Sequence, residues 1–325
     1  MKHISVVTPC WNEELNVEAV YREVKQTFAG LPGYTYEHIF IDNASRDQTV
    51  PILRRIAASD KNVKVILNAR NFGHIRSPYY ALLQTSGDAV ISMASDLQDP
   101  PGLLAELLKK WEEGYKIVTA VKTSSEESYF RFGLRRLYYY LIGKLAEIEL
   151  VKNFTGFGLY DRRVIDILKT LDDPYPYFRG LICDIGFERA SVEFVQPLRK
   201  RGKTKNNFFT LFDMAMLGIT NHSKVPLRLA TMSGFGLSML SLAVAIGYAV
   251  YKLVHWTRFS VGMAPVVIGL FFFASVQLFF IGVVGEYIGA IHTQVLKRPL
   301  VVEKERINFD GDFQPPTARE GSRDG

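Results

Sequence analysis

Two long stretches without charged side chains constrain this chain more than any other feature. Residues 229–251 and residues 259–285 contain no Asp, Glu, Lys or Arg. Each stretch exceeds the roughly 20 residues that an α-helix needs to cross a bilayer. A helix of a water-soluble protein seldom stays uncharged on every face over such a length, because one face normally meets water. The sequence therefore predicts two transmembrane helices, at about 229–254 and 264–291.

The charges around this predicted hairpin indicate its orientation. Five cations lie just outside the spans: Lys224, Arg228, Lys297, Arg298 and Lys304. The connecting loop carries fewer, Lys252 and Arg258. Because cytoplasmic loops retain an excess of Lys and Arg, both ends of the hairpin are expected in the cytoplasm. The amino terminus has the pattern of a strand and lacks the apolar region of a signal peptide. We therefore expect a multi-pass protein of the inner, cytoplasmic membrane, with its large domain in the cytoplasm.

Length, charge and cysteine content limit the remaining possibilities. A chain of 325 residues has room for one catalytic domain and a smaller part. Cys10 and Cys183 are the only cysteines, which suits a reducing compartment and provides no metal-binding spacing. The formal charge of +6, together with two membrane spans, favours lipid headgroups or a phosphorylated ligand over nucleic acid.

The first 121 residues alternate short β-branched runs with amphipathic segments. This alternation is typical of an α/β domain with a parallel sheet covered by helices. Strands are expected at 4–8, 37–42, 63–67, 88–93 and 116–121. Helices are expected at about 13–29, 49–59, 75–86 and 101–113.

Two further segments are candidates for helices that lie in the membrane interface. Residues 129–148 mix aromatic side chains with arginines, a composition that suits an interfacial helix or an ordinary solvated amphipathic helix. A second candidate helix at 206–225 leads into the first span. The predicted organisation is then a catalytic domain at 1–205, a juxtamembrane helix at 206–228, two spans within 229–292 and a cytoplasmic tail at 293–325. The tail is expected to be disordered after about Arg306, because it has few apolar residues there.

Acidic and amide side chains follow the fourth predicted strand, in Asp96-Leu97-Gln98-Asp99-Pro100-Pro101. Ligands of α/β sheets bind at the carboxyl ends of the strands. An acid there can hold Mg²⁺ or Mn²⁺, which prefer a few oxygen ligands together with substrate phosphates. Asp99 fits better as a helix cap, because Pro100 can occupy the first helical position. For Asp96, a structural role without a ligand stays open at this point.

The ends of the first two strands also carry candidate binding groups. Trp11 offers an aromatic plane on which a base can stack, although Asn12 and Glu13 also suit the start of a helix. Asp42 ends the second strand and could accept a hydrogen bond from a base N–H. The chain has no Gly-x-Gly-x-x-Gly after the first strand and no P-loop motif. These absences argue against dinucleotide oxidoreductases and P-loop nucleotidases.

The order of these motifs resembles family-2 glycosyltransferases of the dolichol-phosphate-mannose synthase and bactoprenol glucosyltransferase type. The motifs that carry the resemblance are Pro9-Cys10-Trp11-Asn12-Glu13, residues 41–49, Arg70-Asn71-Phe72-Gly73 and residues 96–101. Later landmarks are Arg179-Gly180-Leu181, residues 199–205, residues 224–228 and Gly285-Glu286-Tyr287-Ile288-Gly289. The resemblance covers roughly residues 4–305.

This resemblance implies a GT-A fold, which is Rossmann-like, with a nucleotide-sugar donor bound over the strand ends. The residues that match the donor nucleotide pocket are Pro9, Trp11, Glu13, Asp42 and Asp96. Asp96 and Gln98 match the catalytic and metal site, with Mg²⁺ or Mn²⁺ as cofactor. The implied acceptor is a polyprenyl phosphate in the bilayer, such as undecaprenyl phosphate. Candidate cations for its phosphate are Lys122, Arg131, Arg179, Arg199 and Lys205. The resemblance is compatible with a homo-oligomer.

The expected activity is transfer of a single sugar, with uridine preferred as the donor base, to a polyprenyl phosphate with inversion at the anomeric carbon. A phosphate monoester has a second pKa of about 6, so this acceptor is a nucleophile without a general base. Two other functions stay open: extension of a glycan or modification of another lipid, and a catalytically silent scaffold that binds a nucleotide sugar. Three positions depart from the pattern of many relatives. This chain has Ala94 and Gly156 where those relatives have Asp, and it has Gln196 where they have Arg.

Overall fold

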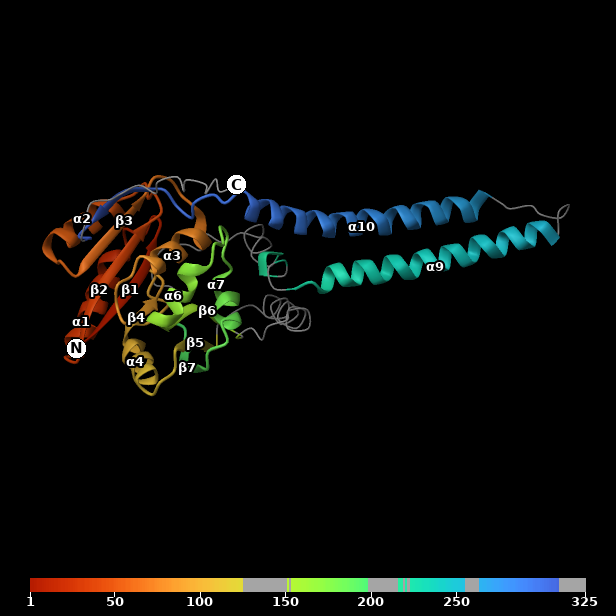
Figure 1. The fold of residues 1–325 in the computed structure, drawn as a ribbon. Helices are drawn as coiled ribbons and strands as arrows, with labels where there is room; N and C mark the ends of the chain where they lie inside the picture. Colours follow the sequence, from red (N-terminus) through yellow and green to blue (C-terminus); the bar gives the residue numbers. More distant parts are fainter. Residues whose placement is uncertain are drawn as a thin grey trace, which may run out of the picture. The chain divides into compact units, whose positions relative to one another are not determined.

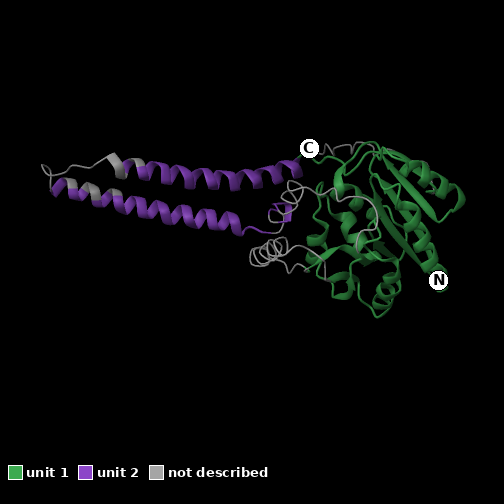
Figure 2. Cartoon of the chain, turned by 180° about the vertical axis from the view of Figure 1, so that it is seen from behind, with its two compact units in different colours: residues 1–136, 150–206, 296–325 green, residues 137–149, 207–295 purple. Residues whose placement is uncertain are grey.

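A computed structural model describes most of the chain. The described residues are 1–124, 151, 153–197, 216–218, 220, 223–254 and 263–309. The predicted interfacial helix at 129–148 and most of the one at 206–225 lie outside these residues. The chain divides into two compact units (Figure 2). Unit 1 comprises residues 1–136, 150–206 and 296–325, and unit 2 comprises residues 137–149 and 207–295.

Unit 1 is built on one eight-stranded sheet with the order β7-β5-β6-β4-β1-β2-β3-β8 (Figure 1). The strands are β1 (Lys2–Cys10), β2 (Tyr34–Asp42), β3 (Val63–Asn68), β4 (Ala89–Ser92), β5 (Ile117–Ser124), β6 (Phe154–Asp161), β7 (Arg189–Val195) and β8 (Glu303–Ile307). The central strands β4, β1, β2 and β3 are parallel. Strand β6 is antiparallel to β4 and β5, and β8 is antiparallel to β3. The five predicted strands are all present, in a mixed α/β sheet.

Helices cover both faces of this sheet (Figure 1). They are α1 (Val17–Ala29), α2 (Thr49–Ser59), α3 (Gly73–Leu83), α4 (Leu104–Glu112), α6 (Arg162–Thr170) and α7 (Phe178–Asp184), with a 3₁₀ turn η1 (Pro101–Leu103) before α4. Val6 belongs to a core cluster that includes side chains of α1, α2 and α4, whereas its neighbour Val7 belongs to a second cluster with side chains of α3, α6 and α7. Successive residues of a strand point to opposite faces, so a strand covered on both faces is a continuous apolar run.

Unit 2 contains two long helices, α9 (Val225–Val254) and α10 (Met263–Val295) (Figure 1). By length and composition, both are apolar enough to cross a membrane, over Val225–Val244 and Ile268–Val295. Most of their large apolar side chains are exposed. The hydroxyl of Tyr287 donates to the carbonyl oxygen of Ser223, two residues before α9, over 2.6 Å. This bond ties the late part of α10 to the beginning of α9.

Sequence reasoning missed strand β8. The predicted domain boundary at residue 205 excludes this strand, although residues 296–325 belong to unit 1. The ordered chain continues for a few residues after Arg306, because Ile307 pairs with Val65 of β3 and Asn308 bonds to two backbone carbonyls. Residues 303–306 are all charged, so the sequence pattern did not indicate a strand. Glu305 finds its partner Arg54, and Glu303 its partner Arg306, only in the folded protein. Residues 310–325 lie outside the described residues.

Candidate functional site

The loops after β1 and β2 interlock at the edge where the parallel strands end. The amide of Asn12 donates to Ser45 Oγ over 2.8 Å, and the amide of Arg46 donates to Asn12 Oδ1 over 2.8 Å. The amide of Glu13 donates to Thr49 Oγ1 over 2.8 Å. Helix α1 begins only at Val17 and has no side-chain cap, so the reading of Asn12 as a helix start is wrong. The interlocked loops instead hold Trp11 and Glu13 beside the end of β2.

Asp42 is a buried carboxylate with spare hydrogen-bonding capacity. Its side chain is nearly inaccessible, because the residue is 1% exposed. Oδ2 accepts the amide of Ser45 over 2.9 Å, whereas Oδ1 has no partner among the described residues. Burial raises the pKa of this carboxyl. A buried acceptor without a donor is costly, so a ligand that supplies an N–H there is favoured.

Trp11 lies next to this acceptor. Cys10 pairs with Asp42 in the register of β1 and β2, and Trp11 is the next residue of the chain. Its side chain is 39% exposed, which leaves part of the indole available to a ligand. Pro9 pairs with Ile41 one step earlier in the same register. The structure therefore brings together four of the predicted donor residues, Pro9, Trp11, Glu13 and Asp42, at the ends of two adjacent strands.

An amide network behind Asp42 was missed by sequence reasoning. Asn43 Oδ1 accepts the backbone amide of Phe72 over 2.8 Å and the side-chain amide of Asn68 over 3.1 Å. Asn43 Nδ2 donates to Asn71 Oδ1 and to the carbonyl oxygen of Gly73. A buried network of this kind favours one backbone arrangement, although Asn68 Oδ1 has no partner among the described residues. The sequence offered one signal for this network: Asn43, an amide residue, directly follows Asp42 at the end of β2.

The loop after β4 separates its two carboxylates. The amide of Ala94 donates to Asp99 Oδ2 over 2.8 Å, and the amide of Gln98 donates to Asp96 Oδ1 over 3.1 Å. Asp99 is buried, and burial raises its pKa to about 6. The predicted capping role of Asp99 is wrong, because η1 follows Pro100 without a side-chain cap. Asp99 closes the loop from inside, while Asp96 and Gln98 stay partly exposed.

This loop fits a divalent cation that is shared with a ligand. No group of three or more His, Cys, Asp or Glu side chains is arranged for a metal within the residues that the structure describes. Asp96 and Gln98 nevertheless offer a carboxylate and an amide oxygen, the hard donors that Mg²⁺ and Mn²⁺ prefer. Mg²⁺ commonly uses one or two carboxylates together with phosphates and water. The residues suit a metal held jointly with a diphosphate.

The structure describes two of the five predicted acceptor cations. Lys122 of β5 donates to Gln196 Oε1 over 2.7 Å, and its charge acts to lower the pKa of Asp99. Lys122 is therefore near the loop after β4. Arg179 of α7 bonds to the carbonyl oxygen of Phe154, and its guanidinium lies 5.3 Å from the centre of the Tyr177 ring. The other three, Arg131, Arg199 and Lys205, lie outside the described residues.

Gly156 of β6, where many relatives are expected to carry Asp, has an unusual backbone conformation. Its φ is +101°, in the left-handed region that side chains disfavour. Its carbonyl oxygen accepts the hydroxyl of the buried Tyr160 over 2.8 Å, which holds this geometry. A side chain at this position would therefore strain the backbone of β6.

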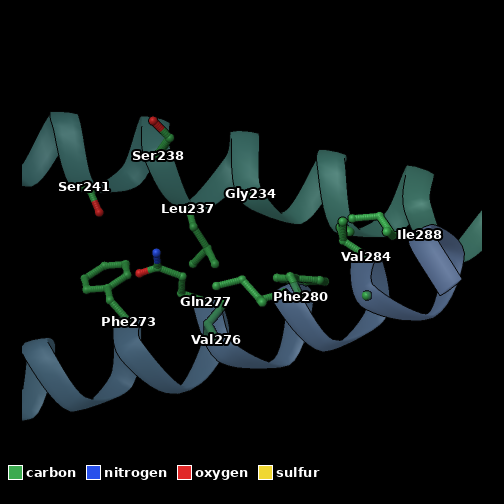
Figure 3. Close-up of a pocket in the computed structure, with 13 residues that line it drawn as sticks. Gly234, Leu237, Ser238, Ser241, Phe273, Val276, Gln277, Phe280, Val284 and Ile288 are labelled. Carbon is green, nitrogen blue, oxygen red and sulfur yellow. The ribbon is translucent and has the colours of Figure 1, made fainter. Parts of the chain in front are cut away.

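A groove lies between α9 and α10 in unit 2. It has a volume of about 600 Å³. Gln277 of α10 points towards α9, and Ser241 of α9 points towards α10 (Figure 3). Small and apolar side chains from both helices form the rest of its walls. Polar side chains on apolar helices commonly face a partner helix, as these do.

Comparison with known proteins assigns the chain to a family. The family described as "Glycosyl transferase family 2" matches residues 5–168. This chain belongs to glycosyltransferase family 2. The family described as "GtrB C-terminal hairpin" matches residues 225–291, which include α9 and most of α10. Together these matches confirm the predicted resemblance, and the glycosyltransferase domain has the expected GT-A fold.

Relatives match this family-2 glycosyltransferase over most of their length. An uncharacterized glycosyltransferase of Bacillus subtilis (strain 168), YkcC, is 33% identical and matches over 95% of this chain and 96% of its own. The bactoprenol glucosyl transferase of Shigella phage SfII is 32% identical over 93% of this chain and 97% of its own. A prophage bactoprenol glucosyl transferase homolog of Escherichia coli (strain K12) is 31% identical over 93% and 98%.

Solved structures of glycosyltransferases are less similar to this family-2 chain. Glucosyl-3-phosphoglycerate synthase from Mycobacterium tuberculosis, in complex with UDP, is 22% identical with a TM-score of 0.44, over 67% of this chain and 78% of its own. The mannosyltransferase PcManGT from Pyrobaculum calidifontis, in complex with GDP-Man and Mn²⁺, is 14% identical with a TM-score of 0.46, over 90% and 86%.

Proposed function

We propose that this protein is a membrane glycosyltransferase that moves one sugar from a UDP-sugar to a polyprenyl phosphate at the cytoplasmic face of the inner membrane. The observation that carries the proposal is the buried Asp42 oxygen without a partner beside the half-exposed Trp11. A nucleoside base that stacks on Trp11 can donate its ring N–H to this oxygen. Uracil has such a group, and uridine is the donor we favour.

The acceptor proposal rests on the hairpin and on the relatives. Bactoprenol glucosyl transferases share about a third of their residues with this chain over nearly its whole length. Helices α9 and α10 have the length and composition to anchor a catalytic domain at a bilayer. A polyprenyl phosphate presents its phosphate at the membrane surface. We assign Lys122 to the acceptor phosphate, because it lies near the loop that carries Asp96.

For this reaction the protein must mainly align the two substrates and neutralise the charge of the leaving diphosphate. The acceptor phosphate is already anionic and nucleophilic at neutral pH, so no general base is required. The protein must hold the acceptor oxygen in line with the anomeric carbon and orient the donor diphosphate. A divalent cation held by Asp96 and Gln98 would neutralise charge on the leaving diphosphate. Direct displacement of this kind inverts the anomeric configuration.

A transfer assay tests the proposal. Full-length protein in nanodiscs is incubated with Mg²⁺, undecaprenyl phosphate and radiolabelled UDP-glucose, and then with a panel of other labelled nucleotide sugars. The expected result is that label enters the organic phase, in a product with inverted anomeric configuration. Retention of the donor's configuration would reject direct displacement.

Two other results would reject the proposed function itself. Label that enters only oligosaccharide indicates a transferase that extends a glycan. Tight donor binding without transfer, across the whole donor panel, indicates a catalytically silent protein.

A further inference from the structure

The chain after α10 returns to the donor side of the sheet. We call residues 299–308 the return segment. Within it, β8 pairs with β3 from Ile307 opposite Val65 to Glu303 opposite Asn68, where β3 ends. One residue further, the amide of Ala69 donates to the carbonyl oxygen of Val302 over 2.9 Å. The return segment thus follows β3 into the loop at residues 69–73.

The return segment also contacts the helix that follows this loop. Arg306 donates to Oε1 of Gln84, the residue just after α3, over 2.7 Å. It also donates to the hydroxyl of Tyr80, within α3, over 3.1 Å. Arg76, in the first turn of α3, donates to the carbonyl oxygen of Pro299. The return segment therefore holds the 69–73 loop on both sides, through β3 before it and through α3 after it.

A buried ion pair keeps Arg306 in this position. The Glu303 carboxylate is 1% exposed and contacts Arg306 Nε over 2.5 Å and Nη2 over 2.7 Å. A carboxylate in such a place strongly requires its cationic partner, because an unpaired buried charge is very unfavourable. The planar guanidinium can satisfy Glu303, Tyr80 and Gln84 at the same time, which an ammonium group cannot do with the same geometry.

From the 69–73 loop, contacts lead directly to the candidate donor pocket. Phe72 donates its amide to Asn43 Oδ1, and Asn71 Oδ1 accepts from Asn43 Nδ2. Asn43 is the neighbour of Asp42 in the chain. The loop therefore lies between two sets of hydrogen bonds, one to the return segment and one to the end of β2.

We propose that the return segment is a positioning element for the donor site, with Arg306 as its main positioning residue. This inference rests on the proposed function, because it takes the pocket at Asp42 and Trp11 to be the nucleotide site. Since the return segment begins four residues after α10 ends at Val295, it links the membrane hairpin by a short stretch of chain to the loop beside the donor base. Loss of this support should loosen the pocket without removing any group that touches the reacting atoms.

The test uses Arg306→Lys in the full-length protein in nanodiscs, with Glu305→Gln as matched control on the same strand. Lysine keeps the charge opposite Glu303 but loses the contacts to Tyr80 and Gln84. Glu305 pairs at the surface with Arg54 of α2, whereas Arg306 contacts α3 and the residue after it. We expect Arg306→Lys to raise the Kd for UDP and the KM for the donor about three- to tenfold, with kcat within twofold, as for the loss of one hydrogen bond. The control should match the wild type.

A second measurement reports on the loop itself. Hydrogen exchange of the Ala69 and Phe72 amides should become faster in Arg306→Lys, while exchange in β1 stays unchanged. If Arg306→Lys does not fold, Tyr80→Phe removes only the hydroxyl that Arg306 contacts and should shift the same quantities in the same direction by less.

The outcomes separate this inference from the proposed function. Faster exchange at Ala69 with unchanged UDP affinity would show that the return segment only completes the sheet, and would overturn the positioning role. An equal loss of affinity in Glu305→Gln would also overturn it. Failure of the wild type to bind UDP or any nucleotide sugar would instead reject the proposed function.

Discussion

Asp96 and Asp99 stand three residues apart on one loop, yet their surroundings give them different chemistry. Asp99 accepts the Ala94 amide inside the loop and has a pKa raised by burial to about 6. Asp96 accepts the Gln98 amide of its own loop through Oδ1 and stays partly exposed. A ligand on the surface of the loop can therefore reach Asp96, while Asp99 supports the shape of the loop.

Asp96→Asn should lower turnover about a hundredfold or more while leaving the fold intact, because it removes the charged oxygen from the proposed metal and diphosphate site. The matched control is Asp172→Asn, which removes a carboxylate from a surface pair with Lys297. The measurement is kcat in the transfer assay, with melting temperature as the check on folding. Wild-type kcat in Asp96→Asn would show that the metal site is misplaced.

His38 makes stability depend on pH. It is fully buried, bonds through Nε2 to Thr8 Oγ1, and burial lowers its pKa from 6.5 to about 3. Between these values the unfolded chain binds a proton that the native protein does not, so stability is lost as the pH falls below 6.5. From pH 6.5 to pH 5 this group should cost about 2 kcal/mol. Between pH 6.5 and pH 5, the melting temperature of His38→Gln should therefore fall by less than that of the wild type. Parallel losses in the two proteins would contradict the assignment.

Gly156→Asp tests whether a carboxylate is missing from the site. With φ at +101°, any side chain at this position costs about 1–2 kcal/mol of backbone strain. We expect a lower melting temperature and no gain in kcat, because the acceptor phosphate needs no base. A rise in kcat would show that a base was lost from this chain.

At the scale of helices and strands, local pattern predicted most of the fold. The continuous apolar runs of β1 to β4 identify strands covered on both faces, and the amphipathic segments between them became α1 to α4 within a few residues. Strand β8 escaped prediction, because Glu303 and Arg306 are charged and find their partners only through tertiary structure. Candidate site residues at or shortly after the ends of strands, such as Asp42 and Asp96, were predictable. The Asn43 network was not, because its partners Asn68 and Phe72 come from a separate part of the chain.

The pairing of β5 with β6 depends on Gly158. A Cβ built there lies 2.4 Å from the carbonyl oxygen of Val118, so the backbone of one strand must move to admit a methyl group. Gly158→Ala should destabilise the protein by about 1–3 kcal/mol. Gly102→Ala is the matched control, because its Cβ meets no atom within 4 Å. Thermal melts of both variants check the expectation, and equal melting temperatures would contradict the close packing of β5 and β6.

For the whole molecule, strand pairing constrains membrane topology. Because β8 pairs with β3, the chain before α9 and the chain after α10 must lie on the same side of any membrane that the two helices cross. One cysteine at a time is added at Lys109, Lys304 or Thr257 in a Cys183→Ser background, in which the remaining Cys10 is buried. Labelling of oriented vesicles with an impermeant maleimide should modify Lys109→Cys and Lys304→Cys from one face and Thr257→Cys from the other. Labelling of Lys304→Cys from the Thr257 side would contradict the hairpin topology.

The position of β8 also sets an order of events during biosynthesis. Arg54 and Glu305, which pair across α2 and β8, are 251 positions apart in the chain. At about 5–20 residues per second, a ribosome needs roughly 12–50 s to make that interval. During this time the outer edge of β3 presents unpaired amides and carbonyls to the cell, and both apolar helices emerge before the strand that covers it. The pairing of β8 with β3 can therefore form only after both apolar helices have been synthesised.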